Sequence, residues 1–345
     1  MQFLDCKITL SFSNQKIKDR SETLINKGIY EVKLKFIASL IFKNHTLSRV
    51  VNLNMGIFDA IVKPMIILLN NKKTEKYSFA VYNDSFFEVD RIHVDEVLST
   101  PSLSIDTDSS KEMKRVFRTV ESAGGTPLRN HIQFSRGVKT SNDTRFIKSS
   151  CTEDCKKVYR GRNIKAYQLN WVGEYLWYRP DLMREKVGCV PHTKEFFEVP
   201  EKLVTQRVNS SYQLLVAYDN NQQYFLDTVN VSNYQTWNKT TSLKYLCGIL
   251  NSKLINFWYC NKYRMPTIGG YELHSIPIVM AKDQSIIISL VDDILDANKN
   301  GTSTAELEQE IDRIVYHLYG LTYDEVLIID PTPPFTQEEY EQDNL

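Results

Sequence analysis

Apolar and polar positions follow two different patterns in the first part of the chain. Residues 30–37 place apolar side chains at helical spacing, and an extended pattern follows at residues 49–53. The apolar run at residues 64–69 then has the length of a buried strand. We therefore predict that residues 1–98 form an α/β domain, built on the last strands of a larger sheet.

Short strands rich in aromatic and β-branched residues predominate after residue 134. The pattern predicts strands over residues 175–178, 202–208, 213–218 and 224–231. The last two flank the segment Asp-Asn-Asn-Gln at 219–222, and Asp and Asn both tolerate turn geometry. We expect these two strands to pair as a β-hairpin.

Helical periodicity returns toward the end of the chain. Residues 240–242 offer N-cap side chains for a helix over residues 243–258, whose apolar positions recur at steps of three and four. A second helix is expected over residues 283–298. The apolar stripe of the first helix is typical of a core-facing surface.

Two capping-box spacings predict where the last helices begin. Ser303 and Glu306 should cap a helix that packs antiparallel to the one before it, as a helical hairpin. Thr322 and Glu325 repeat the spacing ahead of a final short helix. The Pro-rich, acidic residues 331–345 are expected to be a mobile tail.

These patterns together predict a mixed α/β fold in five parts. The parts are a remnant of a methyltransferase-like α/β domain at 1–98, a linker at 99–128, a mixed α/β domain at 129–282, a closing helical hairpin at 283–330 and the acidic tail at 331–345. The linker is expected because residues 99–110 are polar and rich in turn-forming residues.

The formal net charge of zero hides an uneven distribution of charge. Residues 129–207 contain 16 Lys and Arg against 9 Asp and Glu, whereas residues 301–345 contain one Arg and 11 acidic residues. A basic stretch is a solvated face more often than a nucleic-acid surface, so the charge alone does not decide between them.

The six cysteines do not indicate a disulfide framework in a chain of this length. Cys151 and Cys155, with His131 or His192, have some of the residues of a zinc site, but the spacing is one residue longer than in the usual knuckle. Two loop thiols are the favoured interpretation. The chain also lacks a secretory signal at its start and an apolar run long enough to span a bilayer, so we expect a cytoplasmic protein.

No complete catalytic site can be recognised. An adenine N6 methyltransferase needs a Gly-rich loop for S-adenosylmethionine and an Asn/Asp/Ser-Pro-Pro-aromatic motif, and the nearest match, Thr-Pro-Pro-Phe at 332–335, begins with Thr. A metal-dependent nuclease needs a carboxylate followed by Glu-x-Lys. Residues 112–114, behind Asp106 and Asp108, match that motif in letters only. We assign no catalytic, cofactor-binding or metal-binding residue.

Bases, amides and aromatics are interleaved in three segments, residues 159–165, 171–179 and 261–270. Arg can pair with guanine edges or phosphates, and Asn can pair with adenine, so these residue types suit the reading of a DNA duplex. A strand with a solvated face remains an equal alternative when the segments are considered alone.

The order of several segments resembles the C-terminal specificity, or target recognition, domain of TaqI-type adenine-specific DNA methyltransferases and fused type II restriction-modification enzymes. The matching segments are Ser-Arg-Gly-Val-Lys-Thr at 135–140, Tyr-Arg-Gly-Arg-Asn-Ile at 159–164, Pro-Glu-Lys-Leu-Val-Thr-Gln-Arg at 200–207, Tyr-Leu-Cys-Gly-Ile-Leu-Asn-Ser-Lys at 245–253, Ser-Ile-Pro-Ile at 275–278 and the closing helix at 310–322. Residues 56–69 are similar to the last strands of the methyltransferase domain in those enzymes.

The resemblance implies sequence-specific binding of double-stranded DNA, with the chain supplying specificity to a methyltransferase or nuclease partner. The S-adenosylmethionine loop and the Pro-Pro motif are then expected upstream of Met1 or on a separate subunit. The DNA contacts that we predict are Arg136, Lys139, Arg145, Arg160, Arg162, Asn163, Lys165, Arg179, Arg207, Asn209 and Arg264, with the two Asn as base readers.

Two other functions stay open at this point. The chain could retain methyltransferase or nuclease activity through a site that its motifs do not reveal. It could also be a protein-interaction module whose closing helical hairpin docks a partner, with the basic middle merely solvated. Recognition of DNA is the interpretation that we carry forward.

Overall fold

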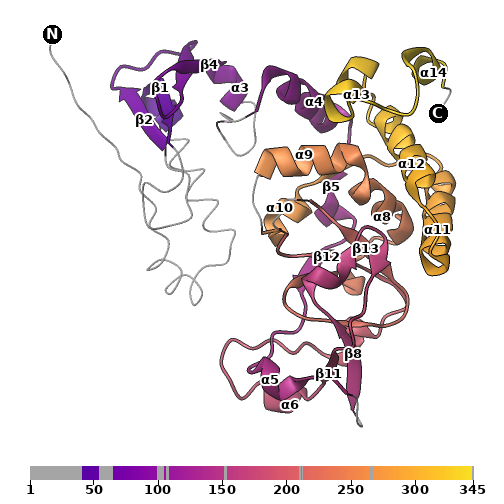
Figure 1. Ribbon diagram of the computed structural model, residues 1–345. Helices are drawn as coiled ribbons and strands as arrows, with labels where there is room; N and C mark the ends of the chain where they lie inside the picture. Colours follow the sequence, from indigo (N-terminus) through magenta and orange to yellow (C-terminus); the bar gives the residue numbers. More distant parts are fainter. Residues whose placement is uncertain are drawn as a thin grey trace. The chain divides into compact units, whose positions relative to one another are not determined.

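The computed structural model describes residues 41–53, 65–98, 105, 109–150, 154–209, 211, 213–263 and 267–343. The chain divides into two units, Met1–Asp108 and Ser109–Leu345. Helices alternate with small sheets in the second unit (Figure 1), and the predicted mixed α/β fold class is confirmed. The helix expected over residues 30–37 lies outside the described residues. Within them, no helix is long and apolar enough to cross a membrane.

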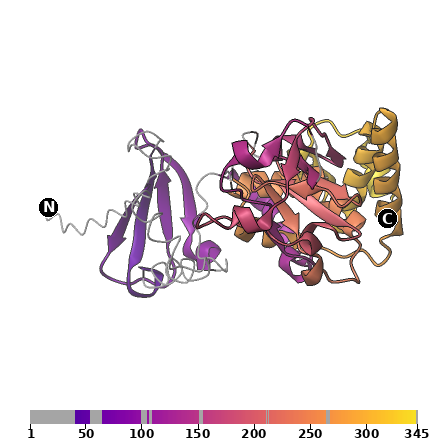
Figure 2. The same cartoon turned by 90° about the horizontal axis from the view of Figure 1, so that it is seen from below.

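The first unit contains a mixed four-stranded sheet, drawn in indigo and purple in Figure 2, and its strands have the order β2-β1-β3-β4. The central pair, β1 and β3, is parallel, and both outer pairs are antiparallel. Val50, Phe79 and Val81 are fully buried between the sheet and the short helix that follows it. The elements are β1 (Thr46–Asn52), β2 (Met65–Asn70), β3 (Ser78–Tyr82), β4 (Glu88–His93) and α3 (Val94–Leu98). The strands expected near residues 49–53 and 64–69 are therefore present.

The second unit contains all the remaining elements. Its strands are β5 (Thr126–Pro127), β6 (Phe134–Arg136), β7 (Ile147–Lys148), β8 (Cys155–Tyr159), β9 (Ile164–Lys165), β10 (Gln168–Leu169), β11 (Tyr175–Trp177), β12 (Lys202–Gln206), β13 (Val216–Asp219), β14 (Tyr224–Phe225), β15 (Val229–Ser232) and β16 (Pro277–Ile278). Its helices are α4 (Lys111–Ser122), α5 (Asp143–Phe146), α6 (Pro180–Met183), α7 (Lys194–Phe197), α8 (Leu243–Asn251), α9 (Lys253–Tyr263), α10 (Gly270–His274), α11 (Ser285–Asn300), α12 (Ala305–Leu318), α13 (Tyr323–Ile329) and α14 (Gln337–Glu341). Three 3₁₀ turns complete it: η1 (Leu128–Asn130), η2 (Gly161–Asn163) and η3 (Tyr234–Thr236).

Two four-stranded sheets organise the middle of this unit. The central sheet has the order β13-β12-β15-β6 and is antiparallel throughout. The second sheet has the order β14-β8-β11-β7, and Figure 1 shows β8 and β11 gathered with α5 and α6 at one end of the unit. A core that includes Val158, Leu176 and Phe225 joins the two sheets.

The predicted β-hairpin over residues 213–231 is wrong, although its turn exists. Asp219 accepts hydrogen bonds from the N–H groups of Asn221 (2.8 Å) and Gln223 (3.0 Å), and Gln222 has a positive φ of 55°. The chain leaves this turn for a different sheet, because β13 pairs with β12 whereas β14 pairs in parallel with β8. The turn therefore links the two sheets.

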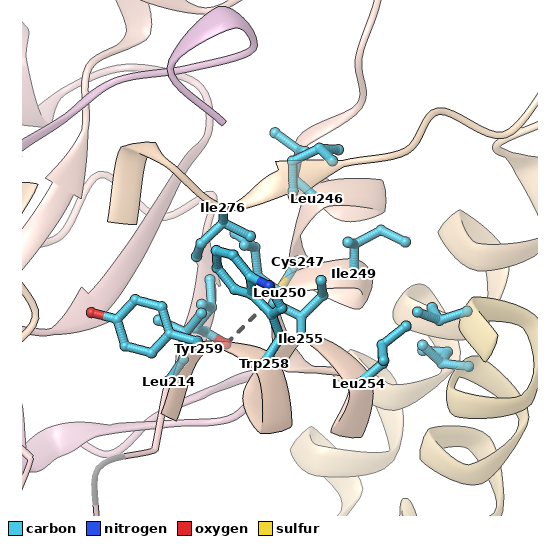
Figure 3. Packing of buried hydrophobic residues seen from close by; sticks show 14 of the residues in the cluster. Leu214, Leu246, Cys247, Ile249, Leu250, Leu254, Ile255, Trp258, Tyr259 and Ile276 are labelled. Carbon is cyan, nitrogen blue, oxygen red and sulfur yellow. Dashed lines mark hydrogen bonds between the residues drawn. The ribbon is translucent and has the colours of Figure 1, made fainter. Parts of the chain in front are cut away.

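The main core of the unit is built around α8 and α9. Ser242 caps α8 as expected, with its hydroxyl accepting from the N–H of Tyr245. The helix predicted over 243–258 is interrupted at Ser252, where ψ is 150°. Figure 3 shows the buried side chains on either side of this break, among them Leu250, Ile255 and Trp258, packed together.

The closing helices pack onto the same core. α11 and α12 lie side by side, and Val291 and Val315 are fully buried. The capping box of Thr322 and Glu325 is confirmed. The box expected at Ser303 does not form, because Thr304 occupies the N-cap position and its hydroxyl binds Glu308 instead.

Two segments expected to lack packing are part of this core. Residues 111–122, inside the predicted linker, form α4, whose Val116 and Val120 are fully buried. Residues 337–341, inside the predicted mobile tail, form α14, and Tyr340 is 3% exposed. Phe335, the last residue of the Pro-Pro motif, stacks on Tyr340 with the ring centroids 5.6 Å apart. The polar composition of both segments hid the few apolar side chains that anchor them.

Candidate nucleic-acid interface

Two arginines lie at one end of the central sheet. Arg136 ends β6 and pairs with Asn230 on β15, while Arg207 follows β12 and its N–H donates to the carbonyl of Thr228 at 2.9 Å. Neither side chain forms an ion pair with a residue that the structure describes. Burial, and then the charge of Arg136, lowers the pKa of Arg207, although Asp227 opposes the shift. This end of the sheet therefore favours the binding of an anion.

The turn between β14 and β15 holds two of the basic segments together. A Cβ atom on Gly137 would lie 2.3 Å from the carbonyl oxygen of Phe225, and one on Gly161 would lie 2.7 Å from that of Thr228. The N–H of Gly161 also donates to the hydroxyl of Thr228 at 2.9 Å. Because only glycine permits such close approach of two backbones, segments that the sequence presents separately become neighbours here.

Gly137→Ala is expected to lower the free energy of unfolding of the chain by about 1–3 kcal/mol. The added methyl would meet two carbonyl oxygens, of Phe225 at 2.3 Å and of Leu226 at 2.5 Å, and backbone cannot move aside as a flexible side chain can. Urea unfolding followed by tryptophan fluorescence measures the change. Gly270→Ala is the matched control, since its methyl would meet only the His274 ring at 3.7 Å. Equal midpoints for the two variants would contradict the expectation.

Arg160 and Arg162 lie close together, but their side chains differ in ion pairing and in exposure to solvent. Arg160 binds Glu174 (Nε to Oε2, 2.9 Å) and Asp143 (3.1 Å), and its side chain is 23% exposed. Burial alone would lower the pKa of Arg160, but the hydrogen bonds to the two carboxylates outweigh it and raise that pKa. Arg162 is 69% exposed, with Glu174 at 3.7 Å. Arg160 therefore ties η2 to its neighbours, while Arg162 reaches into solvent.

Asn163 and Asn209, the two predicted base readers, have structural roles instead. Asn163 is 2% exposed, and its side-chain oxygen accepts from the N–H of Arg160 at 2.7 Å. Asn209 is 7% exposed, donates to the carbonyl of Gln213 and accepts from the N–H of Ser211. Since these hydrogen bonds engage both amides inside the fold, we do not propose either as a base reader.

The other predicted contacts fall into two groups. Lys139 and Lys165 are exposed and form no ion pair with a described residue. Arg145 is held by Glu185 at 2.9 Å, and Arg179 is held by both carboxylate oxygens of Asp181. The two lysines are available to an external anion, whereas the two arginines would first have to leave an acidic partner. The eleventh predicted contact, Arg264, lies outside the described residues.

A basic loop beside β6 was not recognised in the sequence. Arg184 and Lys186, on the loop after α6, are exposed and make no ion pair within the described part of the chain. This loop borders a groove of about 780 Å³ that is also lined by His192, Lys194 and Tyr234. The Nε2 atom of His192 lies 2.7 Å from the carbonyl oxygen of Arg136, so the groove adjoins the arginine site. The sequence signal was the pair of cations beside a Val-Gly tip.

The two histidines considered for metal binding have other partners. His131 bonds to the hydroxyls of Thr126 (2.7 Å) and Thr241 (3.0 Å). In the described ranges, no group of three or more His, Cys, Asp or Glu side chains is placed to hold a metal ion. Cys151 and the Asp residues of the Glu-x-Lys pattern lie outside those ranges, and residues 112–114 themselves lie in the first turns of α4.

Comparison with protein families identifies the domain that carries most of these groups. Residues 156–278 match the family model of the TaqI-like C-terminal specificity domain. This stretch runs from β8 to β16 and includes Arg160, Arg162, Lys165 and Arg207. The resemblance inferred from the order of segments is confirmed within these bounds. None of the curated proteins compared matches the chain.

Two solved structures are similar to the chain at low sequence identity. The type IIL restriction-modification enzyme MmeI, determined in complex with DNA, is 10% identical with a TM-score of 0.45, over 89% of this chain and 48% of MmeI. The type IIG restriction endonuclease BpuSI is 9% identical with a TM-score of 0.37, over 83% of this chain and 45% of BpuSI. The chain thus spans about half the length of these enzymes.

Proposed function

We propose, from the premise that residues 156–278 form a TaqI-like specificity domain, that the chain recognises a sequence in double-stranded DNA for a restriction-modification enzyme. One observation carries the proposal: Arg136 and Arg207 flank β15 with no acidic partner among the described residues. Phosphates supply much of the affinity of DNA for proteins, and two neighbouring guanidinium groups are suitable partners for them.

The cations differ in the role that we assign to them. Arg136 and Arg207 extend from the sheet, whose rigid backbone suits contacts that set the register on the duplex, so we assign them to phosphates, with Lys139 and Lys165. Arg162 projects from a short turn that Arg160 and Glu174 anchor, which suits insertion into a groove. We therefore assign Arg162 to a base edge, with guanine as its natural partner.

Methylation itself would belong to another domain or subunit. An adenine N6 methyltransferase binds S-adenosylmethionine and turns the target adenine out of the duplex. This chain would hold the flanking bases and phosphates while a cytoplasmic partner carries out that step. The protein-interaction alternative has less support, because Ile287 and Ile311 of the closing helices are buried in the chain's own core.

The proposed function is tested by selection from a randomised duplex pool with the purified chain at two salt concentrations. Enrichment of one short motif is the expected result, with binding that weakens as salt rises. Salt-sensitive binding without enrichment would leave DNA binding in place and assign specificity to the complete enzyme. No binding at either salt concentration would overturn the proposal.

Substitutions of the assigned cations should separate the two kinds of contact. Arg162→Ala is expected to cost about 1–3 kcal/mol of binding free energy on the selected site and to relax the preference at one base pair. Arg136→Ala and Arg207→Ala should weaken binding to all sequences alike and reduce the salt slope by about 1 each. Fluorescence anisotropy titrations at several salt concentrations measure both effects. Arg179→Ala serves as the control, since Asp181 holds that guanidinium, and should bind as the unmodified chain does.

A further inference from the structure

The loop between α6 and Val190 carries the most exposed large apolar side chain in the described part of the chain. Val187 is 99% exposed. The next residue, Gly188, has a positive φ of 85°, and a Cβ atom placed there would meet nothing within 4 Å. The tip of the loop therefore projects into open space, with an apolar, β-branched side chain at its end.

The base of this loop is fixed next to the arginine site. Lys139 and Val190 exchange two backbone hydrogen bonds, at 3.0 and 3.1 Å. The carboxylate of Glu185, within the loop, binds Arg145 at 2.9 Å. Because Lys139 follows β6 by three residues, the loop and Arg136 belong to one continuous surface.

Charge distinguishes this tip from an ordinary exposed apolar residue. Arg184 and Lys186 precede Val187 and make no ion pair with a described residue, while Glu185, the one acid of the loop, is neutralised by Arg145. An apolar tip next to two cations suits a duplex groove, where the edges of stacked bases lie beside phosphates. A second Val-Gly tip of this unit, Val172 and Gly173, is 57% exposed at Val172, but its sequence neighbours are Trp171 and Glu174 instead of cations.

We propose that Val187 is a wedge that inserts at one base step of the bound duplex, while Arg184 and Lys186 contact the adjacent phosphates. The proposal rests on the proposed function and adds a deformation of the DNA to it. Partial insertion of a side chain unstacks a base step and bends the duplex, which lets more of the protein surface reach the backbone. The specificity of DNA binding then depends also on how easily that base step bends.

The test compares the full chain with Val187→Ala on a duplex of about 30 base pairs that carries a fluorophore at each end. The duplex is the one enriched by selection or, without enrichment, one of mixed sequence. The unmodified chain should shorten the end-to-end distance measured by energy transfer. Val187→Ala should abolish that shortening and weaken binding about three- to tenfold, with the salt slope unchanged. Ile286→Ala, a 50% exposed apolar residue on α11, should bind and bend as the unmodified chain does.

The outcomes separate the wedge from the proposed function. If Val187→Ala binds and bends the duplex like the unmodified chain, or if the unmodified chain binds without bending it, the wedge is wrong and DNA binding stands. If the unmodified chain does not bind DNA at low salt, both proposals fail. Because the Val187 side chain makes no buried contact, the variant should unfold at the same urea concentration, so a loss of bending reports on DNA alone.

Discussion

Replacing Lys202 by methionine is expected to lower the free energy of unfolding by about 3–5 kcal/mol. Lys202 and Asp219 pair across β12 and β13, both side chains are 0% exposed, and Nζ lies 2.5 Å from Oδ2. The ammonium also donates to the carbonyl of Phe197 at 2.7 Å. Without it, the Asp219 carboxylate would remain buried with no opposite charge, and this carboxylate holds the turn that links the two sheets.

Urea unfolding monitored by tryptophan fluorescence measures the loss. Adding Asp219→Asn to Lys202→Met should recover part of it, because the amide is neutral and its oxygen can still accept from the turn N–H groups. Lys299→Met removes an exposed pair with Asp296 and is the control, with no change in midpoint expected. A Lys202→Met variant that unfolds at the same urea concentration as the control would refute this account of the pair.

A buried carboxyl in the closing helices should make stability depend on pH. Burial raises the pKa of Asp312 to about 7. The N–H and the charge of Lys253 lower this pKa, while the charges of Glu308 and Asp330 raise it by smaller amounts. The unfolded chain releases this proton near pH 3.8, its ordinary pKa. Between these two pH values the folded state binds the proton more tightly, so the contribution of Asp312 to stability falls as pH rises, by up to about 4 kcal/mol.

Asp312→Asn is the variant that isolates this effect. Its amide oxygen can still accept from the N–H of Lys253, the first residue of α9, as Asp312 does at 2.7 Å. The variant should match the unmodified chain near pH 4 and exceed it in stability above pH 7, whereas Asp296→Asn, an exposed change, should follow the unmodified chain throughout. Urea midpoints at a series of pH values give the comparison. A difference that stays constant with pH would show that Asp312 titrates normally.

Local chemistry explains which elements of the fold the sequence predicts well. Ser242 and the Thr322–Glu325 box cap their helices as expected, because a cap needs only residues three positions apart. The break at Ser252 has a local partner and a distant one: the Ser252 hydroxyl accepts from the N–H of Ile255 at 3.3 Å, and the Asp312 carboxylate of α12 accepts from the N–H of Lys253 at 2.7 Å. No periodicity within residues 243–263 could reveal the distant partner.

Strand pairing shows the same limit on a larger scale. Residues 213–231 have the composition of a hairpin, and the Asp219 turn forms, yet Tyr224 pairs with Val158 rather than with the preceding strand. The choice depends on β8, which lies more than sixty residues earlier in the chain. The energy of strand pairing depends on which neighbouring strands the fold provides, and the alternation of apolar and polar residues does not reveal those neighbours.

Some residues of the candidate site could be predicted from the sequence, whereas the roles of others became clear only from the structure. The sequence identified the basic segments, and Arg136, Arg162 and Arg207 remain the best candidates for contacts with DNA. It could not show that Asn163 caps the backbone of Arg160, because an amide that reads a base and one that satisfies an N–H look alike in a sequence. Exposure and existing partners, which only the structure gives, separate the two.

The shared core around α8 and α9 decides how large a segment would have to be moved if the matched domain were transplanted into another protein. Val116 of α4, Val315 of α12 and Tyr340 of α14 all pack in it, and all three lie outside residues 156–278. A graft cut at the limits of the matched domain would expose this interior and leave its helices unsupported. Residues 109–343 are therefore the natural unit of transplantation, and recombination points belong ahead of α4.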